Sequence, residues 1–169
     1  GMVKLGGLEF VLDQIKDLDR LVIVGCGSAY FAGQVGRYML EEYAGIPVEV
    51  ELGSEYRYKN NLQTGKTAVL AITQSGETAD TLASLRKAKE AGLLTLGIVN
   101  TVGSTIARET DAGVHNHAGP EIAVASTKAV ISQLTVLVLL TVLIGRENGK
   151  LEQAEAVTIL EGLEKLPEV

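Results

Sequence analysis

The chain has 169 residues, of which 46% are hydrophobic and 21% charged, which is enough for one globular domain with its own core. The formal net charge is −6 and no cluster of Lys or Arg is present, so a nucleic-acid partner is disfavoured, because a phosphate backbone demands a basic surface. The single cysteine, Cys26, excludes an internal disulfide and fits a reducing cytoplasm.

The most apolar segment, residues 129–144, predicts a buried helix and not a membrane span. A helix of this length would extend about 24 Å, whereas the hydrocarbon core of a bilayer is about 30 Å thick. We expect this helix to lie in the core and in a subunit interface, which predicts a homodimer. No membrane association is expected, and the first residues, which include Lys4, Glu9 and Asp13, do not resemble a signal peptide.

In chain order, the sequence alternates patterns typical of helices and of buried strands. The first half predicts a leading helix (7–18), a strand (20–24), a helix (28–43), a strand (48–52) and a short helical turn (54–58). The second half predicts strands at 67–72, 93–99 and 112–117, helices at 78–91, 104–109 and 122–145, and a terminal helix at 151–165. We interpret the chain as a single domain over residues 1–169 with a core at 20–146.

The short apolar strands separated by helices predict an α/β fold with a five-stranded parallel sheet covered on both faces. In such sheets, ligands bind at the carboxyl ends of the strands, at the point where the strand order reverses. The loops that follow the strands are therefore where a site is expected.

The first of these loops, Gly25 to Tyr30, begins like a dinucleotide-binding fingerprint. Its third glycine position is occupied by Tyr30, which would block close packing of the helix on a pyrophosphate. The simpler interpretation is a tight turn in which Ser28 caps the next helix. No cofactor is expected.

The second loop, with the sequence TQSGET, is rich in hydroxyl and amide groups; its hydroxyl side chains are Thr73, Ser75 and Thr78. A phosphate monoester is nearly a dianion at neutral pH, and hydroxyls together with the free N–H groups of a helix start supply donors for it. Gly76 allows close approach, and Glu77 is expected to point away or to bind another loop. Thr78 could instead serve only as a helix cap, but a cap requires one hydroxyl and not three.

The third loop, Glu121 to Lys128, again places small and hydroxylated residues before a helix. Lys128 is the only cation in the three loops and could contact an anion or remain solvated. Three hydroxyl-rich helix starts in one sheet predict a single pocket for a polyol phosphate. Each loop alone is weak evidence, so the prediction depends on their convergence.

His115 and His117 alternate on the predicted strand 112–117 and are expected to point to opposite faces of it. A shared metal ion is therefore not expected, and no set of Cys, His and Asp with ligand spacing accompanies them.

Five stretches occur in order between Leu21 and Pro167: CGSAY, SEYRY, QSGETADTL, EIAVASTKA and QLTVL. Together they resemble the sugar isomerase (SIS) domains, and within them the first SIS unit of the isomerase half of the glucosamine-6-phosphate synthase family, the glutamine–fructose-6-phosphate aminotransferases. The resemblance implies a three-layer α/β/α sandwich with a five-stranded parallel sheet, of the flavodoxin-like kind.

The resemblance also implies a hexose 6-phosphate as the ligand, with the phosphate held by the second loop. The contacts that it carries over are Ser28, Thr73, Gln74, Ser75, Thr78, Val124 and Ser126. Ala29 stands where many relatives carry a second hydroxyl, which would alter the sugar contacts, and Thr73 stands where a serine is common, which keeps the hydroxyl. In the family, a glutaminase and a second SIS unit supply the catalytic groups, so both are expected as partners.

Three functions therefore remain open. The first is a binding module for fructose-6-phosphate or glucosamine-6-phosphate that belongs to a larger aminotransferase and is not active alone. The second is a stand-alone aldose–ketose isomerase, in which Glu121 is the candidate base for the proton shift and His117 of a neighbouring subunit assists ring opening. The third is a dinucleotide-binding module.

Overall fold

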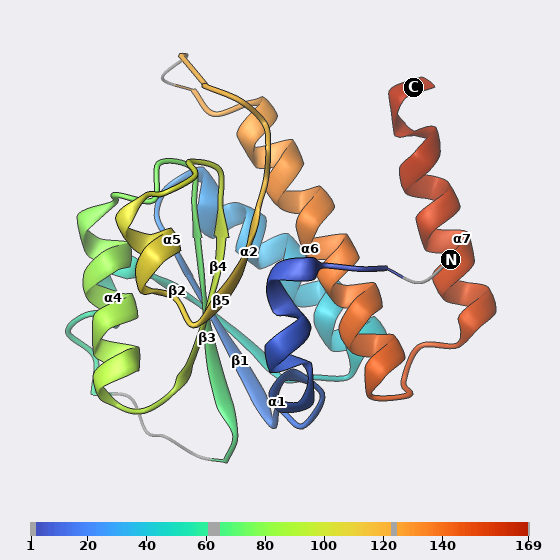
Figure 1. Ribbon diagram of the computed structural model, residues 1–169, viewed down its shortest axis with the longest axis horizontal. Coiled ribbons are helices and arrows are strands. Elements are labelled where there is room, and N and C mark those ends of the chain that lie inside the picture. Colours follow the sequence, from blue (N-terminus) through green and yellow to red (C-terminus); the bar gives the residue numbers. More distant parts are fainter. Residues whose placement is uncertain (1–2, 61–64, 123–124, 169) are drawn as a thin grey trace.

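The computed structural model describes residues 3–60, 65–122 and 125–168, with a five-stranded parallel sheet at its centre (Figure 1). The strands are β1 (Arg20–Gly25), β2 (Val48–Leu52), β3 (Thr67–Thr73), β4 (Leu94–Val99) and β5 (Ala112–His115). They lie in the order β2-β1-β3-β4-β5, and each neighbouring pair is parallel. The predicted α/β fold with a five-stranded parallel sheet is confirmed.

The central strands are buried on both faces, as their uninterrupted apolar sequences require. Every residue of β3 is buried. Because successive side chains of a strand point to opposite faces, Leu21 and Ile23 of β1 belong to one core cluster, whereas Val22 and Val24 belong to another. The sheet thus separates two hydrophobic cores.

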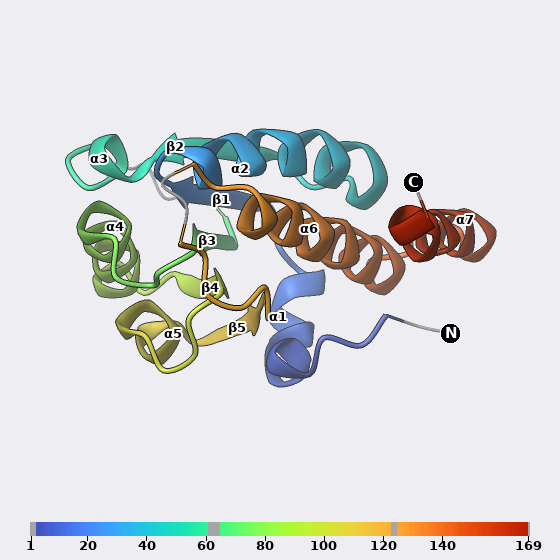
Figure 2. The ribbon, with the colours of Figure 1, turned by 90° about the horizontal axis from the view of Figure 1, so that it is seen from above.

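Helices cover both faces of the sheet, so the domain has three layers (Figure 2). On one face lie η1 (Gly6–Val11), α1 (Leu12–Lys16), α2 (Ser28–Met39) and α6 (Lys128–Glu147). On the other face lie α3 (Gly53–Tyr56), α4 (Ala79–Glu90) and α5 (Thr105–Glu109). Leu137 of α6 is fully buried in the first core, and Leu85 of α4 and Ile106 of α5 are fully buried in the second.

Two predicted helices are divided in the structure. The leading helix expected at 7–18 consists of a 3-10 segment, η1, followed by the short α1. The helix expected at 28–43 is α-helical only to Met39 and continues as a π-helical turn, η2 (Leu40–Ala44). It stops at Gly45, whose φ of 64° is the left-handed conformation that ends many helices.

The long apolar helix begins at Lys128 and not at Ile122, so the predicted start is wrong. The carboxylate of Glu121 accepts hydrogen bonds from the backbone N–H groups of Thr127 and Ala129, at 2.9 and 3.4 Å. These N–H groups have no carbonyl partner within the helix, and Glu121 satisfies them as a cap would. A residue that caps the first turn from outside cannot itself continue the helix.

Among the described residues, one helix, α6, is long and apolar enough to cross a membrane by length and composition alone. However, 56% of its most apolar window is buried, and it packs on α2 and α1. This burial accounts for its apolar sequence. The next helix, α7 (Gln153–Lys165), leads into η3 (Leu166–Glu168) and stands beside α6, away from the sheet (Figure 1).

Candidate functional site

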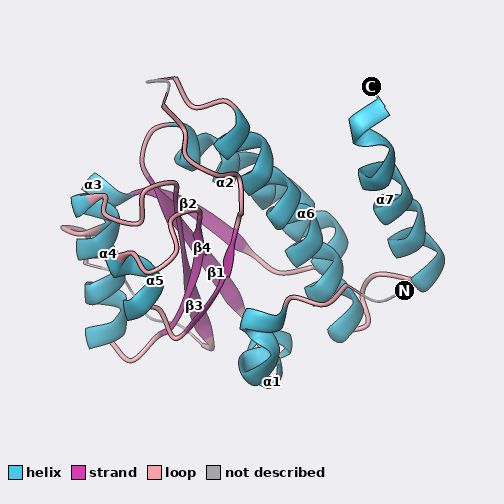
Figure 3. Cartoon of the chain, turned by 45° about the horizontal axis from the view of Figure 1, so that its top comes forward, coloured by secondary structure: helices cyan, strands magenta, loops and turns pink. Residues whose placement is uncertain are grey.

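The strand order reverses between β1 and β3, which lie side by side at the centre of the sheet. From β1 the chain passes to β2 on one side, whereas from β3 it passes to β4 on the other. The loops that leave these two strands therefore diverge, and divergence of this kind opens a crevice at the carboxyl edge of a sheet. The connecting loops at this edge, including the one that leads into α6, are visible in Figure 3.

A cavity of about 200 Å³ lies in this crevice. It is lined by Cys26, Ser28, Ala29, Ile72, Thr73, Gln74, Ser75, Thr78, Glu121, Ser126 and Gln133. The three loops singled out from the sequence thus meet at one place. The predicted substrate-binding residues in the described part of the chain all line the cavity, whereas Val124 lies outside the described residues.

The second loop is held by hydrogen bonds that centre on Thr73. Its Oγ1 accepts a hydrogen bond from the backbone N–H of Gly76 at 3.2 Å and lies 3.2 Å from Thr78 Oγ1. The hydroxyl of Ser75 accepts the N–H of Glu77, also at 3.2 Å. These hydrogen bonds fix the shape of the loop, of which Thr73, Ser75 and Thr78 line the cavity.

The hydroxyls of Ser28 and Thr78 were expected to cap α2 and α4, and neither does so in the described part of the chain. Gly27, and not Ser28, occupies the cap position of α2, so that prediction is wrong. Thr78 does occupy the cap position of α4, but among the described residues its side chain makes no capping hydrogen bond. The interpretation of Thr78 as a cap alone is therefore wrong as well. Among the residues that the structure describes, the first N–H groups of α4 thus receive no hydrogen bond from the side chain of their cap residue, and they carry the positive end of the helix dipole.

Gly76 and Glu77 shape the loop from its outer side. Gly76 has φ of 69°, and a side chain at this position would overlap the Oγ of the buried Ser104. The carboxylate of Glu77 accepts a hydrogen bond from the backbone N–H of Thr105 at 2.7 Å, at the start of α5. This hydrogen bond lowers the pKa of Glu77 below its usual value. The prediction that Glu77 points away or binds another loop is confirmed.

Glu121 faces the cavity, but its carboxylate is already occupied. It accepts hydrogen bonds from the hydroxyl of Ser126 at 2.9 Å, and from the backbone N–H and the hydroxyl of Thr127 at 2.9 and 3.3 Å. The N–H of Thr127 is the main cause that lowers the pKa of Glu121, and partial desolvation opposes it. A carboxylate whose charged form is stabilised in this way is a weaker base.

Of the described residues that line the cavity, none is a lysine or an arginine. Lys128 is exposed at the start of α6 and does not line it. An anion in the cavity would therefore be held by hydroxyls, backbone N–H groups and the dipole of α4.

The two histidines lie apart from this cavity and closer to each other than expected. Their ring centroids are 6.0 Å apart, so the prediction that they point to opposite faces is wrong. The reason is that β5 ends at His115, while His117 has φ of 55° and no longer follows the alternation of a strand. Within residues 3–60, 65–122 and 125–168, no group of three or more His, Cys, Asp or Glu side chains could hold a metal ion.

Four residues that line the cavity had not been predicted as site residues: Cys26, Ala29, Ile72 and Gln133. Cys26 Sγ lies 3.5 Å from Thr81 Oγ1 of α4. Of these, Gln133 could best have been recognised from the sequence, because it is a large polar residue inside the apolar segment 129–144.

The fold and the cavity together define an α/β domain in which hydroxyl-bearing loops and the start of α4 surround a cavity at the carboxyl edge of the sheet. The sequence model of the SIS domain matches residues 14–143, and the chain belongs to this family. It is 48% identical, over 99% of its length, to a glutamine–fructose-6-phosphate aminotransferase (isomerizing) from Symbiobacterium thermophilum. The chain covers only 28% of that relative, so it spans less than a third of its length.

Solved structures agree with this assignment. The C-terminal domain of glucosamine-fructose-6-phosphate aminotransferase from Francisella tularensis superposes with a TM-score of 0.90 at 37% identity, over 93% of this chain and 44% of that one. The sugar isomerase domain of the RpiR transcription factor from Sphaerobacter thermophilus has a TM-score of 0.70 at 20% identity, over 97% of this chain and 88% of that one. The second likeness concerns the fold alone.

Proposed function

We propose that the domain binds a hexose 6-phosphate, either fructose-6-phosphate or glucosamine-6-phosphate, as the phosphate-holding SIS unit of a longer aminotransferase. The observation that carries this proposal is the cavity between the ends of β1 and β3, where the hydroxyls of Thr73, Ser75 and Thr78 lie beside the start of α4. A phosphate requires several donors from different directions, and this loop supplies them without a cationic side chain.

Calorimetric titration of the folded protein with fructose-6-phosphate and glucosamine-6-phosphate tests the proposal. We expect saturable binding of at least one of them, and competition by inorganic phosphate, since the phosphate supplies much of the recognition. Absence of heat at millimolar ligand, with the protein shown to be folded by circular dichroism, would contradict it.

The state of Glu121 supports binding without turnover by this unit alone. Its carboxylate is hydrogen-bonded to Ser126 and Thr127, and the lowered pKa weakens it as a base. The resemblance to the aminotransferases implies that a second SIS unit supplies the catalytic base. We therefore propose that the whole reaction requires such a partner and a glutaminase.

A stand-alone aldose–ketose isomerase is the second candidate, because Glu121 does line the cavity. Exchange of the C2 proton of glucosamine-6-phosphate with solvent deuterium, followed by NMR, tests it. Exchange that is lost in Glu121→Gln but retained in Glu77→Gln, whose carboxylate is turned away, would favour the isomerase. Absence of exchange in the wild-type protein would exclude it.

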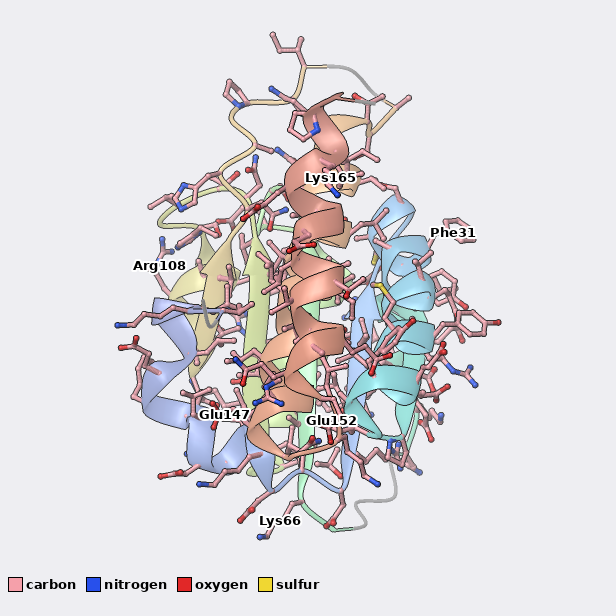
Figure 4. All side chains as sticks on the ribbon, turned by 90° about the vertical axis from the view of Figure 1, so that its right-hand side faces the viewer. Phe31, Lys66, Arg108, Glu147, Glu152 and Lys165 are labelled. Carbon is pink, nitrogen blue, oxygen red and sulfur yellow. The ribbon has the colours of Figure 1, made fainter. Side chains whose placement is uncertain are left out.

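We further propose that the protein forms a homodimer, and that its interface is α2 instead of the apolar helix 129–144 from which the dimer was expected. Phe31, Val35 and Tyr38 are 67%, 48% and 71% exposed, and their spacing places them on one face of that helix. Figure 4 shows the labelled side chain of Phe31 directed away from the body of the domain. Light scattering should give twice the chain mass for the wild type and a lower mass for Phe31→Glu. The same change at the exposed Tyr58 is the control, and a monomeric wild type would refute the proposal.

A further inference from the structure

Gln133 is a buried polar residue that contacts the cavity from α6. Its residue surface is only 1% exposed, and it lines the cavity together with the apolar Ile72 and Ala29. Within the described part of the chain, its Oε1 atom is buried and has no hydrogen-bond partner. An amide oxygen that is removed from water without a partner destabilises a fold, so such atoms are rare in native proteins.

The rest of α6 satisfies its buried polar groups locally. Thr141, which is 2% exposed, donates its hydroxyl hydrogen bond to the carbonyl of Leu137 one turn earlier, at 2.8 Å. Ser132, the neighbour of Gln133, does the same with the carbonyl of Ala129, also at 2.8 Å. Gln133 departs from this pattern, and what distinguishes it is its position on the cavity wall.

The chemistry of the other lining groups indicates what Oε1 would meet. The second loop and the start of α4 offer hydrogen-bond donors, which suit the oxygens of a phosphate. Oε1 is an acceptor and requires a donor in return. A phosphate dianion has no proton to donate, whereas each hydroxyl of a sugar does.

We propose that Gln133 is a further ligand-binding residue, whose side-chain oxygen accepts a hydrogen bond from a hydroxyl of the hexose. This inference rests on the proposed function, and it divides the cavity into a donor-rich part for the phosphate and an acceptor for the sugar. Gln133 therefore contributes to selection of a sugar phosphate over a simple phosphate. The buried oxygen that is unpaired in the free protein gains its partner when the ligand binds.

The test compares fructose-6-phosphate with inorganic phosphate in calorimetric titrations of wild type, Gln133→Met and Gln133→Leu. Both variants replace the amide by an apolar side chain of similar size and so remove the acceptor. We expect the affinity for fructose-6-phosphate to fall about tenfold or more, while the affinity for inorganic phosphate stays within about twofold. Gln34→Met is the matched control, because Gln34 donates to Tyr30 Oη at 2.7 Å and does not line the cavity; its affinities should equal those of the wild type.

Thermal denaturation without ligand provides a second readout. If Gln133 serves the ligand, the melting temperature of the two variants should be equal to or above that of the wild type, since an unpaired buried oxygen is removed. A residue with a purely structural role would instead lower the melting temperature when replaced, and that outcome with unchanged affinities would overturn the inference.

The failures of the two proposals can be told apart. If the wild type does not bind fructose-6-phosphate or glucosamine-6-phosphate, the proposed function fails and this inference fails with it. If the wild type binds and both variants bind fructose-6-phosphate equally well, only the role of Gln133 is refuted. An equal loss of affinity for fructose-6-phosphate and for inorganic phosphate would place the amide at the phosphate, which also overturns the assignment to the sugar.

Discussion

The loops before α4 and α6 contain the same kinds of residues but arrange them in opposite ways. Each has an acid close to several hydroxyls. In the loop before α4, Glu77 is turned toward Thr105, and the hydroxyls of Thr73 and Thr78 remain at the cavity. In the loop before α6, Glu121 is turned inward and accepts the hydroxyl hydrogen bond of Ser126.

This difference shows that a hydroxyl-rich helix start is not by itself a site for an anion. The donors must also not be occupied by a carboxylate of the same loop, whose charge would repel an anion. Glu121 occupies the donors before α6 and adds a negative charge, whereas Glu77 is removed from the donors before α4. The loop before α4 is therefore the one that suits a phosphate.

The largest effect is expected from Gly76→Ala, which would break the loop before α4. The backbone has φ of 69°, and the added carbon would overlap Ser104 Oγ, so we expect a loss of about 2–4 kcal/mol in unfolding free energy together with loss of ligand binding. Urea denaturation measures the unfolding free energy, and calorimetric titration measures the ligand binding.

Gly92→Ala is the control for this change. Gly92 has a similar φ of 74°, but open space surrounds the position where the carbon would be added. Only the backbone cost of about 1 kcal/mol should remain, with ligand affinity unchanged. Equal destabilisation by the two substitutions would contradict the role assigned to the contact with Ser104.

The next largest effect, on ligand affinity, is expected when a single hydroxyl is removed from one loop or from the other. Thr78→Val removes a hydroxyl from the cavity, and we expect the affinity for fructose-6-phosphate to fall about 10- to 100-fold, because hydrogen bonds to a charged group are strong. Thr127→Val removes a hydroxyl that bonds Glu121 outside the cavity lining, and the affinity should stay close to that of the wild type. If both variants lost affinity equally in calorimetry, the distinction between the loops would be lost.

The smallest effect concerns the charge of Glu121. Its pKa in the folded state is lowered, chiefly by the N–H of Thr127, from an ordinary value of 4.5. The carboxylate therefore stabilises the fold at pH values above about 4.5, and this contribution disappears as the pH falls through the lowered pKa. Glu121→Gln should melt at a lower temperature than wild type at neutral pH, and the gap should narrow on acidification below about pH 4.5. A gap that does not change with pH would exclude this explanation.

Much of the fold was predictable because its signals are local. β3 extends only one residue beyond the predicted strand, since a run of apolar residues bounded by polar ones is typical of a buried strand. β2 spans the predicted residues 48–52, where Val and Glu alternate as is typical of a half-buried strand at the edge of a sheet. The hydroxylated residues that line the cavity were also predictable, because hydroxylated loops at the ends of parallel strands converge at one edge of the sheet.

The parts that could not be predicted depend on contacts between distant segments. After β5, the N–H of Ala118 donates to Asn100 Oδ1 and Asn100 Nδ2 donates to the carbonyl of Gly119, at 2.8 Å in each case. These contacts join segments 18 and 19 residues apart, which a strand pattern cannot predict. The burial of Gln133 beside the cavity depends on how α6 packs against α2, which follows β1.

The sequence by itself determined the strands, the hydroxyl-rich loops and the membership of the SIS family, because strand pattern and motif order reside in neighbouring residues. Only the tertiary structure decided which hydroxyls are bonded to a carboxylate of their own loop and which are not. That decision depends on where Glu77 and Glu121 find their donors, and Thr105 lies 28 residues from Glu77 along the chain. A carboxylate binds the N–H groups that the packed elements bring to it, and no local pattern of residues encodes that choice.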